Sequence, residues 1–258
     1  MAIVYLDFHK AFDVVSHTKL MLRLPYYGIR GSVLSWLKNF FTGSTRQTKI
    51  DNILSDSANL VSGVVQGSGV GQLMFLVYIN ELIELLDKIG VKVKAFADDV
   101  KIYVRIVNDI DSDVLQRALN SLQQWANTWQ LIISVNKCCV LNIGNPRLAV
   151  NVNIGNSALP QPSSVLDLGI TTTSNLSPST HTRNIVCKAN SRAIAIHRCF
   201  TRLVRAYKTY VRPLVDSNSV IWYPSAVGDI EITERVQRNF TKNWLACKAL
   251  RIPNGLNA

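Results

Sequence analysis

The stretch Ala95-Phe96-Ala97-Asp98-Asp99-Val100 decides how this chain of 258 residues is interpreted. It joins two apolar, strand-like runs, 91–96 and 100–104, through two adjacent carboxylates. A third aspartate, Asp7, interrupts the apolar run 2–8 in the same manner. Adjacent carboxylates repel one another, and burying them is costly. The pattern therefore indicates either an exposed hairpin turn, for which Asp is well suited, or a site for divalent cations.

Composition predicts a globular chain with a basic C-terminal third. Hydrophobic residues make up 48% of the sequence, enough for a sizeable core in one large or two small domains. Residues 1–180 carry 15 Lys/Arg and 13 Asp/Glu, a net charge of +2. Residues 181–258 carry 13 Lys/Arg and 4 Asp/Glu, a net charge of +9. Polyanions are the natural partners of such a segment, although a solvated helix surface is the simpler alternative.

The cysteines and the N-terminus predict an intracellular protein, in the nucleus or cytoplasm, that is not secreted. The five cysteines are odd in number and lack metal-ligand spacing, so we expect reduced thiols. The first residues lack the basic segment of a signal peptide. The longest uncharged stretch, 57–80, is broken by glycine and polar residues, so we expect no membrane partner.

The order of the predicted elements favours an α+β fold with an antiparallel sheet followed by a helical region. The first part of the chain should contain a strand at 2–8, a helix from Ser16 or His17 to Gly28, a helix capped by Ser32, and short strands around Asp51-Asn52. A helix over 73–86, a hairpin over 91–104 and a helix that is capped by Asp109 or Asp111 and ends at Trp129 should follow. Strands at 138–143 and 164–170 then precede helices that begin at Pro178, with a break near 213–224.

Several segments, taken in order, resemble the reverse transcriptases of non-LTR (LINE-type) retrotransposons. Segments 5–17 (Tyr-Leu-Asp-Phe-His-Lys-Ala-Phe-Asp-Val-Val-Ser-His), 65–73 (Val-Gln-Gly-Ser-Gly-Val-Gly-Gln-Leu) and 96–99 (Phe-Ala-Asp-Asp) resemble the first three palm motifs. Segments 136–138 and 166–170 resemble the fourth and fifth, and 210–238 resembles the region downstream of the palm. The resemblance covers nearly the whole chain.

This resemblance implies a polymerase right-hand palm, an antiparallel sheet with packed helices, followed by a basic thumb-like helical domain. Residues 1–143 would form the palm core, 144–177 connecting strands with a primer-grip-like segment, and 178–258 the thumb-like region. The family places a fingers region before the first catalytic strand. Because the chain begins almost at that strand, we expect the fingers to be missing and the isolated chain to be nearly inactive as a polymerase.

The resemblance also assigns an activity, RNA-directed DNA polymerisation, in which deoxynucleoside triphosphates extend a DNA primer on an RNA template. Asp7, Asp98 and Asp99 would be the catalytic ligands of two Mg²⁺ ions, with Mn²⁺ as a substitute. Lys137 would protonate the pyrophosphate leaving group, although a solvated lysine at a strand start is an equal alternative.

Four further residues would bind the nucleotide according to the resemblance: Phe8, Phe12, Gln66 and Gly67. Phe12 would pack on the sugar and exclude a ribose 2′-hydroxyl, although its residue type also suits an ordinary core aromatic. Gln66 and Gly67 would contact the nascent base pair, and their alternative is a turn that leads into a helix. Asp13 is expected to cap a helix.

The nucleic-acid-binding residues of the thumb-like region would be Arg183, Lys188, Arg192, Arg198, Arg202 and Arg205. Their spacing does not form a single stripe, and contacts of this kind bind phosphates without reading sequence. Val65 and Gln72 stand where the family commonly has proline, and Leu166-Asp167 where it usually has an aromatic. Two alternatives remain: a catalytically silent nucleic-acid-binding relic, and a structural protein with a fortuitous Asp-Asp turn.

Overall fold

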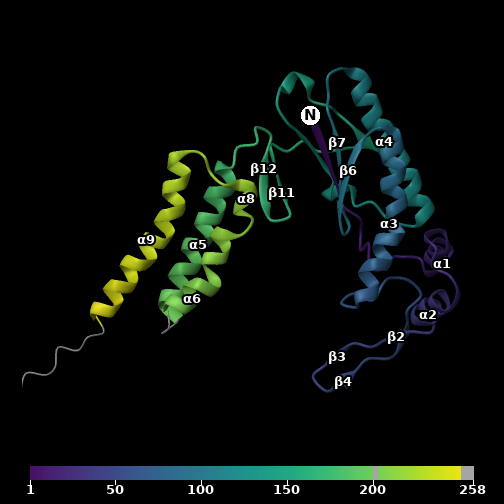
Figure 1. The fold of residues 1–258 in the computed structure, drawn as a ribbon, viewed down its shortest axis with the longest axis horizontal. Coiled ribbons are helices and arrows are strands. Elements are labelled where there is room, and N and C mark those ends of the chain that lie inside the picture. The colour runs from purple at the N-terminus through teal and green to yellow at the C-terminus, as the bar shows by residue number, and fades with distance from the viewer. Residues whose placement is uncertain (200–202, 251–258) are drawn as a thin grey trace, which may run out of the picture. The chain divides into compact units, whose positions relative to one another are not determined.

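The computed structural model describes residues 1–199 and 203–250, which divide into two compact units (Figure 1). The first unit comprises Met1–Pro162 and the second begins at Ser163.

A four-stranded sheet organises the first unit. Its strands, β1 (Ala2–Leu6), β6 (Lys92–Phe96), β7 (Asp99–Val104) and β8 (Cys139–Asn142), lie in the order β6-β7-β1-β8. All neighbouring strands are antiparallel, and Leu6 pairs with Val100 at one end of the β1–β7 ladder. Because strand side chains alternate between faces, Val4 and Ile102 enter the core while Tyr5 and Lys101 pair on the second face.

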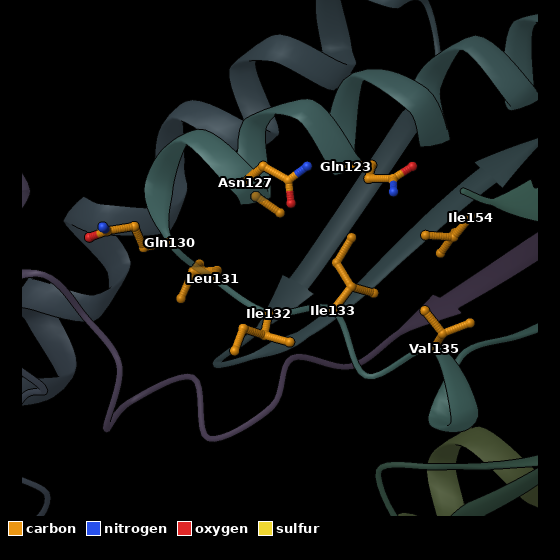
Figure 2. A pocket seen from close by; sticks show the side chains of 9 residues that line it. Gln123, Asn127, Gln130, Leu131, Ile132, Ile133, Val135 and Ile154 are labelled. Atoms are coloured by element: carbon orange, nitrogen blue, oxygen red, sulfur yellow. The ribbon is translucent and has the colours of Figure 1, made fainter. Parts of the chain in front are cut away.

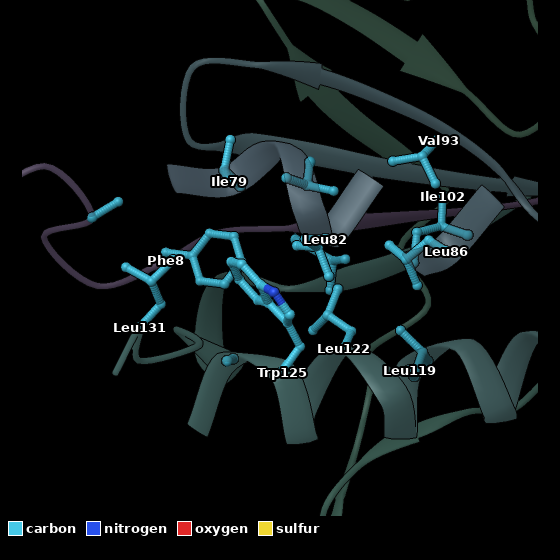
Figure 3. Close-up of a cluster of buried hydrophobic side chains, with 14 of the residues drawn as sticks. Phe8, Ile79, Leu82, Leu86, Val93, Ile102, Leu119, Leu122, Trp125 and Leu131 are labelled. Carbon is cyan, nitrogen blue, oxygen red and sulfur yellow. The ribbon is translucent and has the colours of Figure 1, made fainter. Parts of the chain in front are cut away.

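Two long helices, α3 (Gly69–Ile89) and α4 (Asp109–Trp129), build the core against this sheet. Figure 3 shows Leu82 and Leu86 of α3 with Leu119, Leu122 and Trp125 of α4, beside Val93 and Ile102 of the sheet. α3 is long and apolar enough to cross a membrane by length and composition. A buried core helix passes the same test, and Phe75, Tyr78 and Leu82 are buried.

Shorter elements complete the first unit. They are α1 (His17–Arg23), a 3-10 turn at Leu24–Tyr27, α2 (Gly31–Phe41), β2 (Thr45–Arg46), β3 (Lys49–Ile50), β4 (Ile53–Leu54), β5 (Ala58–Asn59), 3-10 turns at Val135–Lys137 and Pro146–Leu148, β9 (Asn153–Ile154) and β10 (Ser157–Ala158). β3 and β4 form a hairpin around Asp51-Asn52, which confirms the short strands expected there.

The helix starts agree only in part with the sequence predictions. The predicted cap Ser16 does accept a hydrogen bond from the backbone N–H of Lys19 at 3.5 Å. The predicted cap Ser32 is wrong, because α2 begins at Gly31 after an extended Arg30 without a side-chain cap. Asn108, rather than Asp109 or Asp111, caps α4, and Asp111 completes a capping box from inside the helix.

The second unit contains one hairpin and five helices among its described residues. They are β11 (Ser164–Asp167), β12 (Ile170–Thr173), α5 (Ser179–Cys199), α6 (Leu203–Tyr210), α7 (Arg212–Asp216), α8 (Ser219–Trp222) and α9 (Val227–Leu250). Ala189, Ala193 and Ile196 of α5 share a small core with Val236 and Phe240 of α9. The small alanine side chains allow α5 and α9 to pack closely along their length.

The expected α+β class with antiparallel sheets is therefore confirmed. The three predicted domain ranges, and the identities of palm and thumb attached to them, stay predictions.

Candidate active site

The catalytic candidates Asp7 and Asp99 lie at the same end of the central ladder. Leu6, the last residue of β1, pairs with Val100 of β7. Asp7 directly follows Leu6, and Asp99 directly precedes Val100. Asp98 occupies the β6–β7 turn beside Ala97, whose φ of +55° is left-handed. Asp7 and Asp98 are half-buried and Asp99 is exposed. The β1–β7 pairing thus brings Asp7 and Asp99 to the same end of the two central strands, and Asp98 lies in the adjoining β6–β7 turn.

Lys137 lies next to Asp7, although 130 residues separate them in sequence. Its Nζ stands 3.3 Å from Oδ1 and 3.4 Å from Oδ2 of Asp7. The lysine side chain is 64% exposed and that of Asp7 is 27% exposed, so solvent screens this ion pair. The ion pair therefore places the ammonium group of Lys137 next to the Asp7 carboxylate.

The segment before Lys137 fixes the backbone of Asp7. The N–H of Ser134 donates to the carbonyl oxygen of Asp7 at 2.8 Å, and the N–H of Lys137 donates to that of Ser134 at 2.8 Å. The next residue, Cys138, is fully buried, and burial raises the pKa of its thiol to about 11. A neutral thiol therefore packs behind the carboxylate and adds no charge to the site.

The donor set suits a hard divalent cation, because carboxylate oxygens are the ligands that Mg²⁺ and Mn²⁺ prefer. Within the described residues, however, no group of three Asp, Glu, His or Cys side chains is close enough to hold a metal ion. The carboxylates therefore fit a metal by chemistry and by their place on the sheet, and they are not gathered around one point.

The loop after Asp7 is bonded to the segment that carries Gln66 and Gly67. The N–H groups of Gly63 and Val64 donate to the carbonyls of Val15 and Phe12, each at 2.8 Å. The Gln66 amide lies 3.4 Å from Oδ1 of Asp13, so Asp13 is a partner of Gln66 rather than the predicted helix cap. These bonds bring the first two motif segments together.

Two of the nucleotide-site candidates belong partly to the core. The Phe12 ring lies 4.3 Å from the Phe75 ring of α3 and is half-buried. Phe8 is 2% exposed, so a contact between Phe8 and a nucleotide would fall to its backbone. Gln66 and Gly67 are exposed, and Gly67 has a φ of +85°, a conformation that glycine adopts without strain.

The basic candidates lie on helices of the second unit. Arg183, Lys188, Arg192 and Arg198 are exposed on α5, and Arg205 is exposed on α6. Arg192 also donates to the carbonyl oxygen of Tyr210 at 3.3 Å. Arg202 lies outside the described residues.

Comparison with known families decides the identity of this arrangement. The model of the family described as reverse transcriptase (RNA-dependent DNA polymerase) matches residues 2–172. The chain belongs to the reverse transcriptase family. The match spans Asp7, Gln66, the Asp98-Asp99 turn and Lys137, so every candidate of the first unit lies inside it. The basic residues on α5 and α6 lie beyond the matched range.

Similar reverse transcriptases come from mobile elements of flies. A probable RNA-directed DNA polymerase from transposon X-element of Drosophila melanogaster is 28% identical and covers 70% of this chain and 20% of its own length. The polymerase from mobile element jockey of Drosophila funebris is 23% identical over 80% of this chain and 21% of its own length. The predicted membership of the non-LTR retrotransposon lineage is confirmed. The chain spans about a fifth of the length of these relatives.

Among solved structures, a telomerase from Candida tropicalis in complex with a fragment of telomeric RNA is similar, with a TM-score of 0.49 and 9% identity. The likeness covers 85% of this chain and 38% of the telomerase chain.

Sequence reasoning missed the residues that support Asp7 from behind. Ser134 and Cys138 contact its backbone from more than 120 positions away. Their residue types carry no catalytic signal, so only the strand register reveals them.

Proposed function

We propose that this chain provides the palm of an RNA-directed DNA polymerase that extends a DNA primer on an RNA template. One observation carries the proposal: in a chain of the reverse transcriptase family, Asp7 and Asp99 flank the same end of two paired strands. Because the chain spans about a fifth of its relatives, the polymerase activity of the whole protein is part of the proposal.

Asp7, Asp98 and Asp99 would hold two divalent ions, Mg²⁺ or Mn²⁺. When bound, such a pair would neutralise phosphate charge and align the attacking and leaving oxygens of a phosphoryl transfer. The half-buried Asp7 would anchor this site, because one backbone hydrogen bond from the N–H of Ser134 holds its carbonyl oxygen in place. Asp98 lies in the β6–β7 turn, and Asp99 is the first residue of β7, where it pairs with Phe96.

The remaining side chains would position the deoxynucleoside triphosphate and the leaving group. Phe12 would exclude a 2′-hydroxyl, and its ring contact with Phe75 would keep it in place. Gln66, held by Asp13, would contact the nascent base pair, and Gly67 would allow close backbone approach. Lys137, already beside Asp7, would donate a proton to the leaving pyrophosphate.

The exposed basic residues of α5 and α6 would bind the phosphates of the template–primer duplex. Nonspecific contacts of this kind release counterions, so binding should weaken steeply with salt.

Primer extension tests the proposal. The chain is given an RNA template with a DNA primer, Mg²⁺ and four deoxynucleotides, beside an Asp98→Asn, Asp99→Asn double variant. Asp51→Asn is the matched control, because Asp51 also occupies a hairpin turn, that of β3–β4. Because the isolated chain is expected to be nearly inactive, the proposal expects weak Mg²⁺-dependent extension by the wild type and by Asp51→Asn, and none above background by the double variant. Equal extension by all three would contradict it.

A second candidate function is a catalytically silent nucleic-acid-binding protein derived from such a polymerase. It is favoured by the Lys137–Asp7 ion pair and by the lack of a gathered metal group in the described residues. It predicts salt-sensitive binding of the same duplex by wild type and double variant alike, without extension by either protein.

A further inference from the structure

A cavity of about 460 Å³ lies in the first unit, between the C-terminal end of α4 and the segment that follows it. Figure 2 shows Gln123 and Asn127 on the helix side, with Ile133, Val135 and Ile154 across from them. Gln130 and Ile132 lie toward one end. Its volume falls within the range of about 300–1,000 Å³ that is usual for small-molecule sites.

The lining is mainly aliphatic, with three carboxamide side chains, those of Gln123, Asn127 and Gln130. Most of its wall consists of isoleucine, leucine and valine side chains, and no charged residue is among the described lining residues. The carboxamides of Gln123 and Asn127 form no hydrogen bond with another described residue. Gly155, which lacks a side chain, leaves room for the Gln123 amide: a Cβ there would come within 3.0 Å of Nε2. An ion would lack a counter-charge here, whereas a neutral molecule with a hydrogen-bond acceptor could accept from the amide N–H groups of Gln123 and Asn127.

One wall of this cavity is bonded directly to the segment that follows Asp7. Ile132 accepts a hydrogen bond from the N–H of His9 at 2.7 Å, and Ile133 forms a β-bridge with Phe8. The neighbouring Ser134 holds the carbonyl oxygen of Asp7. A molecule that contacts Ile132, Ile133 and Val135 therefore presses on the segment that fixes Asp7.

We propose that this cavity is a binding site for a neutral, largely apolar organic molecule whose polar end accepts hydrogen bonds from the amides of Gln123 and Asn127. Its apolar body packs on Ile133, Val135 and Ile154, and its presence stiffens the 131–135 segment and hence the backbone of Asp7. The site is separate from the proposed nucleotide and metal residues and does not depend on polymerase activity.

Nile red, a neutral planar dye, is a suitable probe, and its fluorescence reports entry into an apolar site. Asn127→Trp would fill the cavity from an exposed helix position, and Ile132→Glu would place a charge at its end where the side chain is 58% exposed. Gln124→Trp is the matched control, because Gln124 is also exposed on α4 and does not line the cavity.

The proposal expects saturable dye binding that weakens at least about tenfold in Asn127→Trp and Ile132→Glu, a loss of about 1.4 kcal/mol, and is unchanged in Gln124→Trp. Bound dye should also slow hydrogen exchange of the amide protons of His9 and Ser134 in the wild type. The absence of dye binding, equal affinity in all four proteins, or unchanged exchange at both amides would overturn the proposal.

Discussion

Gly71 shows how a residue without a side chain allows the 65–68 loop, which carries the proposed nucleotide-site residues Gln66 and Gly67, to pack against α3. A Cβ on Gly71 would meet the carbonyl oxygen of Val65 at 2.3 Å, a distance that real Cβ atoms do not adopt. Ser68 ties the same loop to the helix, since its hydroxyl donates to Val65 at 2.7 Å and accepts from the N–H of Gly71 at 3.0 Å. Close contact between α3 and the 65–68 loop thus holds Gln66 and Gly67 near Asp13.

We predict that Gly71→Ala lowers the free energy of unfolding by about 1–3 kcal/mol, the usual cost of overpacking against backbone. Gly69→Ala is the control in the same helical turn, because a Cβ there meets nothing within 4 Å. It should be neutral or stabilising by up to about 1 kcal/mol. Urea unfolding of the two variants measures this difference. Equal free energies of unfolding for Gly71→Ala and Gly69→Ala would contradict the prediction, because the 65–68 loop would then move aside for the added Cβ without loss of stability.

The thiol of Cys138 should be inert where Cys187 reacts. Burial raises the pKa of Cys138 to about 11, whereas Cys187 is exposed on α5. At about pH 8, iodoacetamide should therefore alkylate Cys187 in the folded protein and leave Cys138 unmodified, because the thiolate is the nucleophile that attacks the reagent. Mass spectrometry identifies the modified residues. Labelling of Cys138 in the folded chain at the rate seen in urea would contradict the burial behind Asp7.

The residue types of the site could be predicted from the sequence, and their partners could not. Asp7, Asp98 and Asp99 stand out because carboxylates interrupt apolar runs. The ion pair between Lys137 and Asp7 depends on the placement of β8 beside β1, a long-range pairing that no local pattern encodes.

At the scale of elements, periodicity located most helices and strands, and capping was less predictable. The strand pattern before Asp98 and after Asp99 predicted the β6–β7 hairpin. Asn108 caps α4 although two aspartates follow it, because the capping box needs the acceptor three residues before Asp111. Several side chains that are suitable caps stand side by side there, so the sequence alone does not choose among them.

His181 links β12 to α5 and should make the second unit sensitive to acid. The N–H of Thr171 donates to Nδ1 of His181 at 3.1 Å, and the ring packs edge-on against Trp222 at 5.2 Å. Burial, and secondarily the charge of Lys188, lowers the pKa of His181. The unfolded chain therefore binds this proton more readily, so stability is present above the ordinary pKa of about 6.5 and is lost as pH falls.

We predict that the urea midpoint of the wild type falls more steeply between about pH 7 and about pH 5 than that of His181→Asn. Asparagine keeps an acceptor for Thr171 and does not titrate. Circular dichroism at each pH gives the two slopes. Parallel slopes would mean that His181 is protonated equally in the folded and unfolded chains.

For the whole molecule, the uneven distribution of net charge along the sequence matches the division of the chain into two structural units. The nearly balanced residues 1–180 include the sheet with the three aspartates, and the excess of positive charge belongs to the helical unit. The fold class and the family were predictable because the motifs occur in order along the chain. The cavity beside α4 could not be predicted from the sequence, because amide and aliphatic side chains like those that line it also occur on the sides of ordinary helices.

The most direct test of the central claim is calorimetric titration of Mn²⁺ into the wild type, Asp7→Asn and Asp51→Asn. If Asp7 anchors a metal site at the end of the β1–β7 ladder, the wild type and Asp51→Asn bind Mn²⁺ alike, and Asp7→Asn binds at least about tenfold more weakly. Equal Mn²⁺ affinity in all three proteins, or no binding by the wild type, would contradict the assignment of Asp7 as a metal ligand.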